Sequence, residues 1–383
     1  MIRLLTAFTF EIDDSRLAAE EIRKQLDREH ALLKNSVGFI FCSLGFVSSG
    51  AAAAVSRALP CESIGCTTHG IATAEIMGEN MLAVAVLTSD DVFFRIGLSD
   101  PLDADGETRI KKLYEQLSGP PKGAPSLILV SHSNPSHFSG DRVLNILDRL
   151  SGGTPLFGTN ALDETIENRT PLVIYNGNSY TDRLALLAMY GAVEPRFAVT
   201  SLPVMNIYSK QAIVTEVQDG RLVSINNIPA VEFMEKLGII SKNKVNAVYG
   251  FPLLIDNNDG WGPKSCAIHS IEDGGVLRCG SAIAQGATLK LVNQMQDELL
   301  YNSKQFAESI KNEGGKKNHL IFSCFGRSAP LVDMKDEMSL FQKNLEGAAY
   351  MFIYSGGEFC PVRDEQGGIR NCFHQFSIIS ASF

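Results

Sequence analysis

The clearest pattern along the chain is a repeated succession of buried strands and amphipathic helices. Apolar runs at residues 37–43, 63–67 and 81–87 predict three strands, with a helix of small residues between the first two. The same order of elements returns at residues 126–191 and a third time at residues 320–380. Units of this length are too long for a solenoid period, and they are typical of β-α-β-β building blocks in an α/β domain.

Other patterns precede the first unit and separate the second unit from the third. Residues 2–10 alternate as an edge strand does, and Ser15 is a good N-cap for the amphipathic helix that follows. Residues 197–283 predict an antiparallel set of strands, in which Pro229 opens a short helix. A long helix is expected from about Leu291 onward. We therefore expect an α/β chain with mixed sheets, in which repeated units form two packed halves and carry an antiparallel insertion.

Length and composition restrict the domain count and the class of protein. The 383 residues suggest roughly two to three domains. The most plausible boundary lies near Glu194-Pro195, between halves at 1–195 and 196–383. Hydrophobic residues make up 45% of the chain and charged residues 20%, which is typical of a globular protein and unlike a disordered one.

Charge and hydropathy exclude several partners. The net charge of −9 repels phosphate backbones, and no lysine- or arginine-rich stripe offsets it, so we expect no nucleic-acid binding. The longest apolar stretch, residues 184–193, is about half of the ~20 residues that a membrane helix needs. Acidic residues interrupt the apolar start of the chain before a signal peptide could form. We expect a cytoplasmic protein with no membrane insertion.

Cysteine spacing and the common catalytic motifs give little support for an enzyme. The eight cysteines form no C-x-x-C pair, which argues against a disulfide framework and a zinc ribbon. The sequence contains no P-loop, no dinucleotide-binding glycine motif, no H-E-x-x-H and no G-x-S-x-G. We expect no metal, no cofactor and no catalytic residue.

Small and polar residues gather where the repeated strands end. A right-handed helical crossover makes the first two strands of each unit parallel, so their carboxyl ends share the ligand-binding edge of the sheet. This brings together three pairs of segments: Ser43 with Cys66-Thr67-Thr68-His69, Ser131-His132 with Thr159-Asn160, and Cys324-Phe325-Gly326-Arg327 with Gly356-Gly357-Glu358.

The third of these clusters predicts a site for a small zwitterion such as an amino acid. The planar guanidinium of Arg327 suits a carboxylate, and Glu358 could accept an ammonium group. Alternatively, Arg327 and Glu358 pair only with each other, and His374 is a structural histidine rather than a further donor. The candidate ligand-binding residues are Thr67, Asn160, Cys324, Gly326, Arg327, Gly357, Glu358 and His374.

A cysteine-dependent enzyme is the main alternative. Cys324 could act as a nucleophile if His374 lowered its pKa, and Cys66 with His69 offers a second such pair. Both cysteines close buried strands, where a small hydrophobic side chain needs no catalytic role. A third hypothesis is an interaction scaffold that binds protein partners and no small ligand.

Several sequence pieces resemble the FIST family of intracellular sensory modules. In chain order they are Ile64-Gly65-Cys66-Thr67-Thr68-His69-Gly70, Gln285-Gly286-Ala287-Thr288, Phe322-Ser323-Cys324-Phe325-Gly326-Arg327 and Tyr354-Ser355-Gly356-Gly357-Glu358-Phe359-Cys360-Pro361. The resemblance implies a FIST N-like domain at 1–195 and a FIST C-like domain at 196–383. It further implies a sensor that binds a small ligand, possibly an amino acid, and signals through a protein partner.

Overall fold

A computed structural model describes most of the chain. The described residues are 2–28, 32–119, 123–133, 135, 138–162, 170–202, 210–218, 220–239, 252–312, 317–363 and 368–383. All structural statements below refer to these residues.

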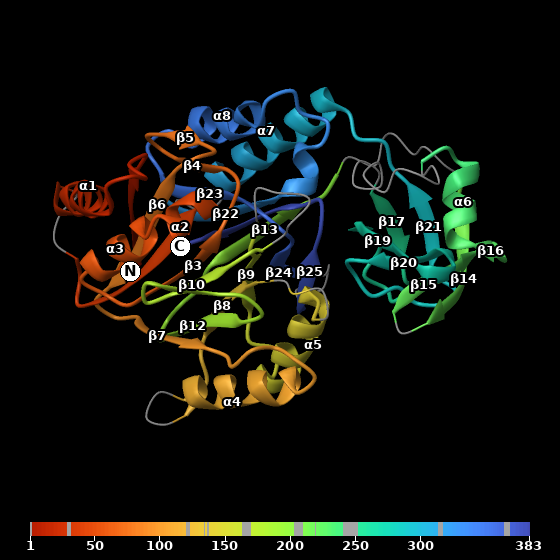
Figure 1. The fold of residues 1–383 in the computed structure, drawn as a ribbon, viewed down its shortest axis with the longest axis horizontal. Coiled ribbons are helices and arrows are strands. Elements are labelled where there is room, and N and C mark those ends of the chain that lie inside the picture. The colour runs from red at the N-terminus through yellow and green to blue at the C-terminus, as the bar shows by residue number, and fades with distance from the viewer. Residues whose placement is uncertain are drawn as a thin grey trace.

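Three copies of one repeat build the larger part of the molecule (Figure 1). The first consists of β1 (Arg3–Thr9), α1 (Ser15–Arg28), β2 (Asn35–Cys42), α2 (Leu44–Ser48), α3 (Ala51–Ala58), β3 (Ser63–Thr67), β4 (Ile71–Thr73), β5 (Met77–Gly78) and β6 (Leu82–Ser89). The second consists of β7 (Phe93–Leu98), α4 (Gly106–Ser118), β8 (Leu127–His132), α5 (Gly140–Ser151), β9 (Leu156–Asn160), β10 (Val173–Tyr175), β11 (Asn178–Tyr180) and β12 (Leu184–Tyr190).

The third repeat has the same order but contains a large insertion. It consists of β13 (Arg196–Thr200), α7 (Gln296–Asn312), β22 (Asn318–Cys324), the 3-10 turn η3 (Phe325–Ser328), α8 (Met334–Asn344), β23 (Ala349–Ser355), β24 (Glu358–Arg363), β25 (Ile369–His374) and β26 (Ile378–Ser382). The insertion lies between β13 and α7. The repeat therefore comprises an edge strand, one helix and a short hairpin in addition to the predicted β-α-β-β unit.

Strand pairing is the same in each repeat and confirms the predicted units. The two crossover-linked strands are parallel, as β2 and β3 show, and the last strand of the repeat pairs antiparallel beside the first of them. The strands β1, β7 and β13 lie at the edges of the three sheets. The two helices of a repeat pack on each other outside its sheet, α1 on α3, α4 on α5 and α7 on α8.

The repeats are joined by an exchange of short hairpins that the sequence did not reveal. Hairpin β4–β5 of the first repeat pairs beside β23 of the third. Hairpin β10–β11 of the second pairs beside β3 of the first, and β24–β25 of the third pairs beside β9 of the second. Each sheet is thus completed by a neighbour, and the exchange closes into a ring.

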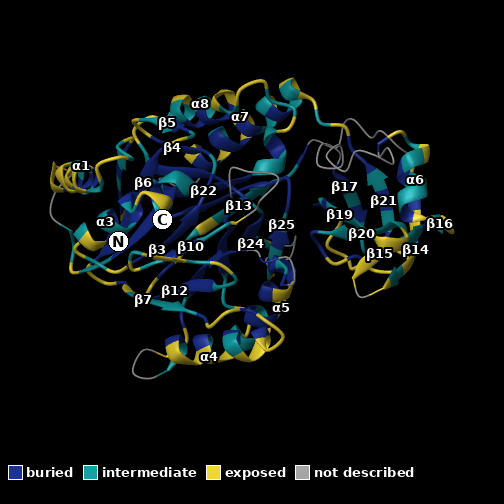
Figure 2. Ribbon diagram, viewed as in Figure 1, coloured by how far each residue is buried: buried dark blue, intermediate teal, exposed yellow. Residues whose placement is uncertain are grey.

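The inner faces of the three sheets share one hydrophobic core. Phe322 of β22 lies 5.1 Å from Phe157 of β9 and 6.1 Å from Phe41 of β2, measured between ring centroids. One aromatic side chain from each repeat therefore meets near the middle of the ring, in a cluster that draws on all three sheets. Figure 2 shows these strands as the most buried part of the molecule.

The insertion is a separate antiparallel sheet, seen at the right of Figure 1. Its elements are β14 (Ala212–Gln218), β15 (Arg221–Ile225), β16 (Ile228–Pro229), α6 (Ala230–Lys236), β17 (Leu253–Asp256), β18 (Lys264–Cys266), β19 (Ile268–Glu272), the 3-10 turn η2 (Asp273–Gly275), β20 (Val276–Cys279) and β21 (Thr288–Leu291). Its apolar side chains form a core of their own. The predicted antiparallel insertion is therefore confirmed.

Three predictions around the insertion have different outcomes. Residues 197–200 were expected in the antiparallel set, but β13 pairs with β26 and belongs to the third repeat. The strand predicted to start at Val245 falls partly in residues 240–251, which lie outside the described part of the chain. Residue 195 falls between the second and third repeats, and a domain division there stays a prediction.

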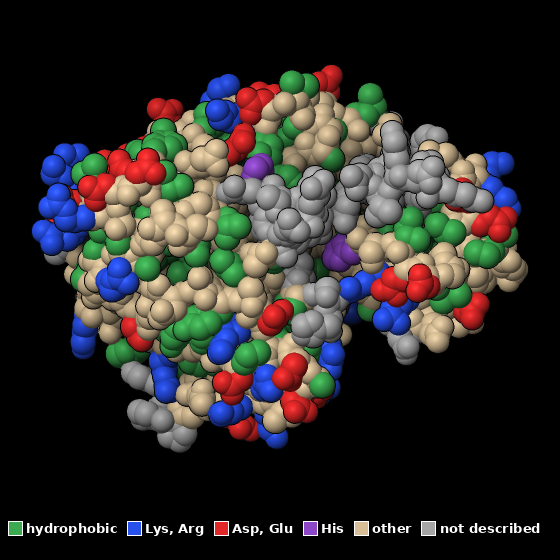
Figure 3. Space-filling model, viewed as in Figure 1, with side chains coloured by type: hydrophobic (Ala, Val, Ile, Leu, Met, Phe, Trp, Pro, Cys, Tyr) green, Lys and Arg blue, Asp and Glu red, His purple; other side chains and the backbone are tan. Residues whose placement is uncertain are grey.

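Two surface properties bear on partners. Among the described residues, no helix combines the length and the apolar character that crossing a bilayer requires. On the face drawn in Figure 3, acidic and basic side chains are interspersed rather than gathered into a patch of one sign.

Candidate functional site

Backbone hydrogen bonds tie the strand ends of all three repeats together. They run from Tyr354 N to Gly70 O (2.9 Å), from Leu162 N to Thr67 O (2.9 Å), from Asn160 N to Gly357 O (2.8 Å) and from Gly356 N to Asn160 O (3.0 Å). Each bond joins two different repeats, so the three predicted clusters lie at one end of the ring. The sequence predicted pairing within each unit, which is confirmed, but not this meeting of the three units.

One alternative predicted from the sequence, an ion pair between Arg327 and Glu358, is wrong. The side chain of Arg327 is fully buried and pairs with Glu337 of α8, with Nη2 3.2 Å and Nε 3.3 Å from Oε1. Nη2 also donates to Ser303 Oγ at 2.9 Å and to Asn302 Oδ1 at 3.3 Å. A ligand carboxylate would have to displace these acceptors to reach the guanidinium.

Glu337 completes this buried cluster and was missed by the sequence analysis. Its Oε1 accepts from Ser303 Oγ at 2.6 Å, and its Oε2 accepts from Tyr354 OH at 2.8 Å and from Ser323 Oγ at 3.2 Å. Both charges of the ion pair are therefore paired and hydrogen-bonded, which is the condition for burying them. Glu337 lies in the first turn of its helix, where acidic residues are common because the positive end of the helix dipole stabilises them. Its position in the sequence therefore did not indicate a buried ion pair.

Glu358 is buried as completely as Arg327 but has fewer partners. Oε1 accepts a short hydrogen bond from Ser355 Oγ, whereas the buried Oε2 has no hydrogen-bond partner within the geometric limits among the described residues. Burial raises the pKa of this carboxyl well above its ordinary value of 4.5, although Ser355, Arg327 and Cys324 favour the ionised form. Glu358 is therefore an acid held near the strand ends with one oxygen unsatisfied.

Two further unsatisfied polar atoms lie around the segment 324–326. The half-buried ring of His69 packs edge-on against Phe325 at 5.3 Å, and its buried Nδ1 has no partner in the described part of the chain. Gln294 donates through Nε2 to Gly326 O at 3.4 Å, while its Oε1 is buried and unpartnered among the same residues. Buried polar groups are nearly always hydrogen-bonded, so these atoms call for partners, which ordered water or a bound molecule can supply.

Gln294 was not singled out from the sequence. It follows β21 in a segment with no recognisable motif, and only the fold brings it to Gly326. His69 was considered solely as a base for Cys66.

The other predicted ligand-binding residues already have structural contacts. Thr67 Oγ1 accepts from Leu172 N at 3.0 Å, and Asn160 Oδ1 bonds His132 Nδ1 at 2.9 Å. His374 lies opposite Glu358 in the β24–β25 pair, and its Nε2 contacts Cys360 O at 3.0 Å. Burial lowers the pKa of His374 to about 4, so it is neutral at pH 7.

Gly326 and Gly357 make room for aromatic rings. A Cβ at Gly326 would lie 2.5 Å from the ring of Phe376, and one at Gly357 would lie 2.5 Å from the ring of Phe373. Gly357 also has a φ of 130°, which L side chains rarely adopt. The absence of a side chain at these positions serves packing beside the site.

The two candidate nucleophiles sit in surroundings that oppose thiolate formation. Burial raises the pKa of Cys66 to about 12, and burial together with the Glu358 charge raises the pKa of Cys324. A reactive cysteine needs the opposite shift.

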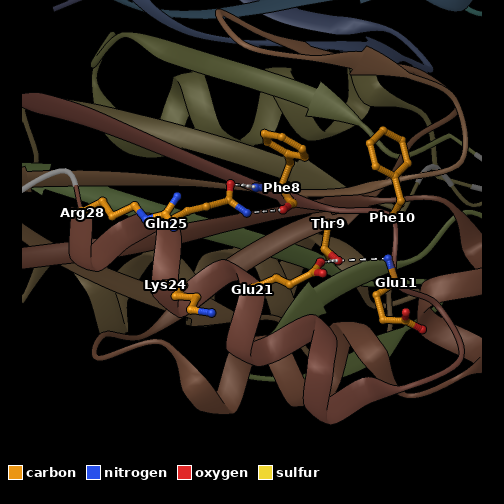
Figure 4. Close-up of a pocket in the computed structure, with 8 residues that line it drawn as sticks. All are labelled: Phe8, Thr9, Phe10, Glu11, Glu21, Lys24, Gln25 and Arg28. Carbon is orange, nitrogen blue, oxygen red and sulfur yellow. Dashed lines mark hydrogen bonds between the residues drawn. The ribbon is translucent and has the colours of Figure 1, made fainter.

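Metal-ligand groups and surface hollows give no second site here. Over the described ranges, no group of three or more His, Cys, Asp or Glu side chains is arranged to hold a metal ion. An open hollow of about 510 Å³ lies between the end of β1 and helix α1 (Figure 4). In it, Gln25 bonds the backbone N and O of Phe8, which covers part of the edge of β1.

Comparison with known proteins assigns a family to nearly the whole chain. The FIST N domain matches residues 36–228, and the FIST C domain matches residues 230–361. No curated protein sequence matches. Among solved structures, a cyanuric acid hydrolase from A. caulinodans is similar at 12% identity and a TM-score of 0.23, over 49% of this chain and 71% of that one. The chain therefore belongs to the FIST family of sensory and signal-transduction domains.

Proposed function

We propose that the chain senses a small polar ligand bearing an amine, with Glu358 as the charged anchor. The observation that carries the proposal is the buried Oε2 of Glu358, which has no hydrogen-bond partner among the described residues. A protonated amine would donate to this oxygen and would supply the charge that lets the carboxyl ionise.

The neighbouring unsatisfied atoms support a ligand with more than one polar group. Gln294 Oε1 can accept only, so it calls for a second donor, while His69 Nδ1 can donate or accept according to its tautomer. An amino acid or a related polar amine fits this set. Because Arg327 is engaged with Glu337, the amine rather than the carboxylate of such a ligand makes the charged contact.

The position of the site suggests how binding becomes a signal. Glu358 starts β24, which belongs to the third repeat but pairs with β9 of the second. A ligand that binds one arrangement of these repeats more tightly than another shifts the population toward it. A protein partner that reads the same arrangement would then receive the signal.

A thermal-shift screen of amino acids and other small amines tests the proposal. A ligand present at 100 times its Kd stabilises the folded state by about 2.7 kcal/mol. We expect a shift with wild type and none with Glu358→Gln, while Glu75→Gln, at an exposed position in the β4–β5 turn, keeps it. The proposal is wrong if no amine stabilises wild type, or if Glu358→Gln responds as wild type does.

A further inference from the structure

The inserted sheet contains two cysteines at neighbouring strand ends. Cys266 ends β18 and Cys279 ends β20, and each thiol donates to a nearby backbone carbonyl, Cys266 Sγ to Ala267 O at 3.6 Å and Cys279 Sγ to Leu277 O at 4.0 Å. We propose that Cys266 and Cys279 form a reversible disulfide, which makes the inserted sheet a thiol redox switch. This inference does not depend on the identity of the ligand bound near Glu358.

Strand pairing puts the two thiols on one face of the sheet. Cys279 lies opposite Ile268, and Gly280 N donates to Ala267 O at 2.9 Å. Cys266 is two residues before Ile268, so its side chain is on the same face and diagonal to Cys279. The pairing is irregular just after Ile268, and such a bulge lets the strand bend as the sulfur atoms approach.

Burial differs between the two partners in a way that suits oxidation. Cys266 is fully buried, whereas Cys279 is partly exposed and gives a small oxidant access to the pair. The neighbouring Cys279 thiol lowers the pKa of Cys266, whereas Cys266 and burial raise the pKa of Cys279. A thiolate is the reactive form in both oxidation and disulfide formation.

A hydroperoxide is the class of oxidant that the chemistry requires. The thiolate attacks the peroxide oxygen, breaks the O–O bond and becomes a sulfenic acid, while the alcohol or water leaves. The second thiol then attacks the sulfenic sulfur, the S–S bond forms, and water leaves with the thiol proton. Overall, two thiols and one hydroperoxide give one disulfide, one alcohol or water, and one further water.

The thiol pair adjoins the contact between the insertion and the ring. Ala267, next to Cys266, donates its backbone N–H to Gln375 Oε1 at 3.0 Å. Gly280, next to Cys279, packs so closely that a Cβ there would lie 2.0 Å from Gln375 Nε2. Gln375 directly follows His374, which is paired with Glu358. A disulfide would move both residues that contact Gln375 and thereby alter this contact beside the candidate site.

Cys360 and Cys372 offer an internal comparison. They lie directly opposite each other in the β24–β25 pair, with Cys360 fully buried and Cys372 partly exposed, and burial raises the pKa of both thiols. We expect this pair to stay reduced under conditions that oxidise Cys266 and Cys279.

The test is oxidation of the full chain with hydrogen peroxide, followed by alkylation and peptide mass mapping. We expect Cys266 and Cys279 to lose alkylation together, to appear as one linked peptide pair, and to regain alkylation after dithiothreitol. Amide hydrogen exchange at Ala267 should rise in the oxidised protein. In Cys279→Ser, the linkage should vanish, whereas Cys372→Ser should retain it.

Several results would overturn the proposal. Cys266 and Cys279 could remain alkylated while Cys61, a partly exposed thiol, is oxidised, or Cys360 and Cys372 could form the linkage instead. Unchanged exchange at Ala267 in protein that carries the disulfide would contradict its effect on the Gln375 contact. The wild-type mapping decides the disulfide even if a serine variant fails to fold.

Discussion

Two fully buried ionisable side chains, Arg327 and Glu358, lie at the same end of the ring but differ in how completely they are hydrogen-bonded. Arg327 has a carboxylate partner on α8 and three further acceptors, two on α7 and the backbone O of Phe376. Glu358 has one hydroxyl donor, and its second oxygen is unsatisfied among the described residues. From the sequence, the two residues were expected either to bind one ligand together or to pair only with each other.

The difference is the reason why we propose a structural role for Arg327 and a binding role for Glu358. A buried ion pair whose groups are all hydrogen-bonded has little to gain from a ligand, since a ligand would only replace existing partners. A buried carboxyl with a free oxygen gains a hydrogen bond and a charge partner when a ligand binds. We therefore assign the Arg327–Glu337 cluster to stability and Glu358 to binding.

Breaking the Arg327–Glu337 pair should have the largest effect. Glu337→Ala leaves the guanidinium buried without its counter-charge, which costs about 3–5 kcal/mol in the free energy of unfolding. Urea denaturation measures this cost. The double variant Arg327→Met/Glu337→Leu should recover much of it, because it removes both charges and retains apolar volume. A loss below about 1 kcal/mol in Glu337→Ala would show that the pair is not structural.

Glu358 should make stability fall as the pH rises. Its pKa is raised in the folded state, so between 4.5 and that higher pKa the unfolded chain releases a proton that the folded chain retains. The free energy of unfolding then decreases by about 1.4 kcal/mol per pH unit from this group alone. The difference between wild type and Glu358→Gln, measured by urea denaturation from pH 4 to 8, isolates this slope. Equal pH profiles would contradict the buried, poorly satisfied carboxyl.

A buried histidine away from the site should contribute with the opposite sign. His319 of β22 is fully buried, contacts Ser382 Oγ at 2.8 Å, and has its pKa lowered by burial from 6.5 to about 4. The contribution of this group to stability therefore falls as the pH falls from 6.5 to 4, by up to about 1.4 kcal/mol per unit. His319→Gln should remove this contribution, leave the equal contribution of His374, whose pKa is also lowered to about 4, and not change ligand binding. A changed ligand response in His319→Gln would contradict the assignment of ligand binding to the region of Glu358.

The smallest expected effect comes from the hydroxyl that serves Glu358. Ser355→Ala removes the hydroxyl hydrogen bond to Glu358 and should cost about 1 kcal/mol in stability at pH 5. It should also raise the pKa of Glu358 further, because the bond favours the ionised form. The pH profile of unfolding for this variant checks both points. The control is Ser339→Ala, at a half-buried serine on α8 whose hydroxyl donates only to Asp336 O of its own helix.

The sequence predicted the repeated units because each depends on local patterns. Long apolar runs and caps such as Ser139, whose Oγ accepts from Arg142 N, define the strands and helices on their own. The exchanged hairpins could not be predicted in the same way. The strands β4 and β10 have only three residues each, and each pairs with a distant repeat, so no local pattern determines their partners.

The nearness of the two strand-end segments was predicted, but the pairing of the candidate side chains was not. The parallel strands β22 and β23 place Cys324 beside Ser355, and Glu358, which starts β24 in a different sheet, lies near Cys324. The partner of Arg327 came from helix α8, and two of the unsatisfied atoms came from His69 and Gln294, far apart in the chain. These contacts depend on tertiary packing, which strand-end reasoning does not include.

The most direct test is a crystal structure of the chain grown with the amine that stabilises it most strongly. We expect density for the ligand amine within hydrogen-bond distance of Glu358 Oε2, with the Arg327–Glu337 ion pair intact. Ligand density elsewhere, or Arg327 released from Glu337 and paired with a ligand carboxylate, would contradict the assignment of binding to Glu358 and of stability to Arg327.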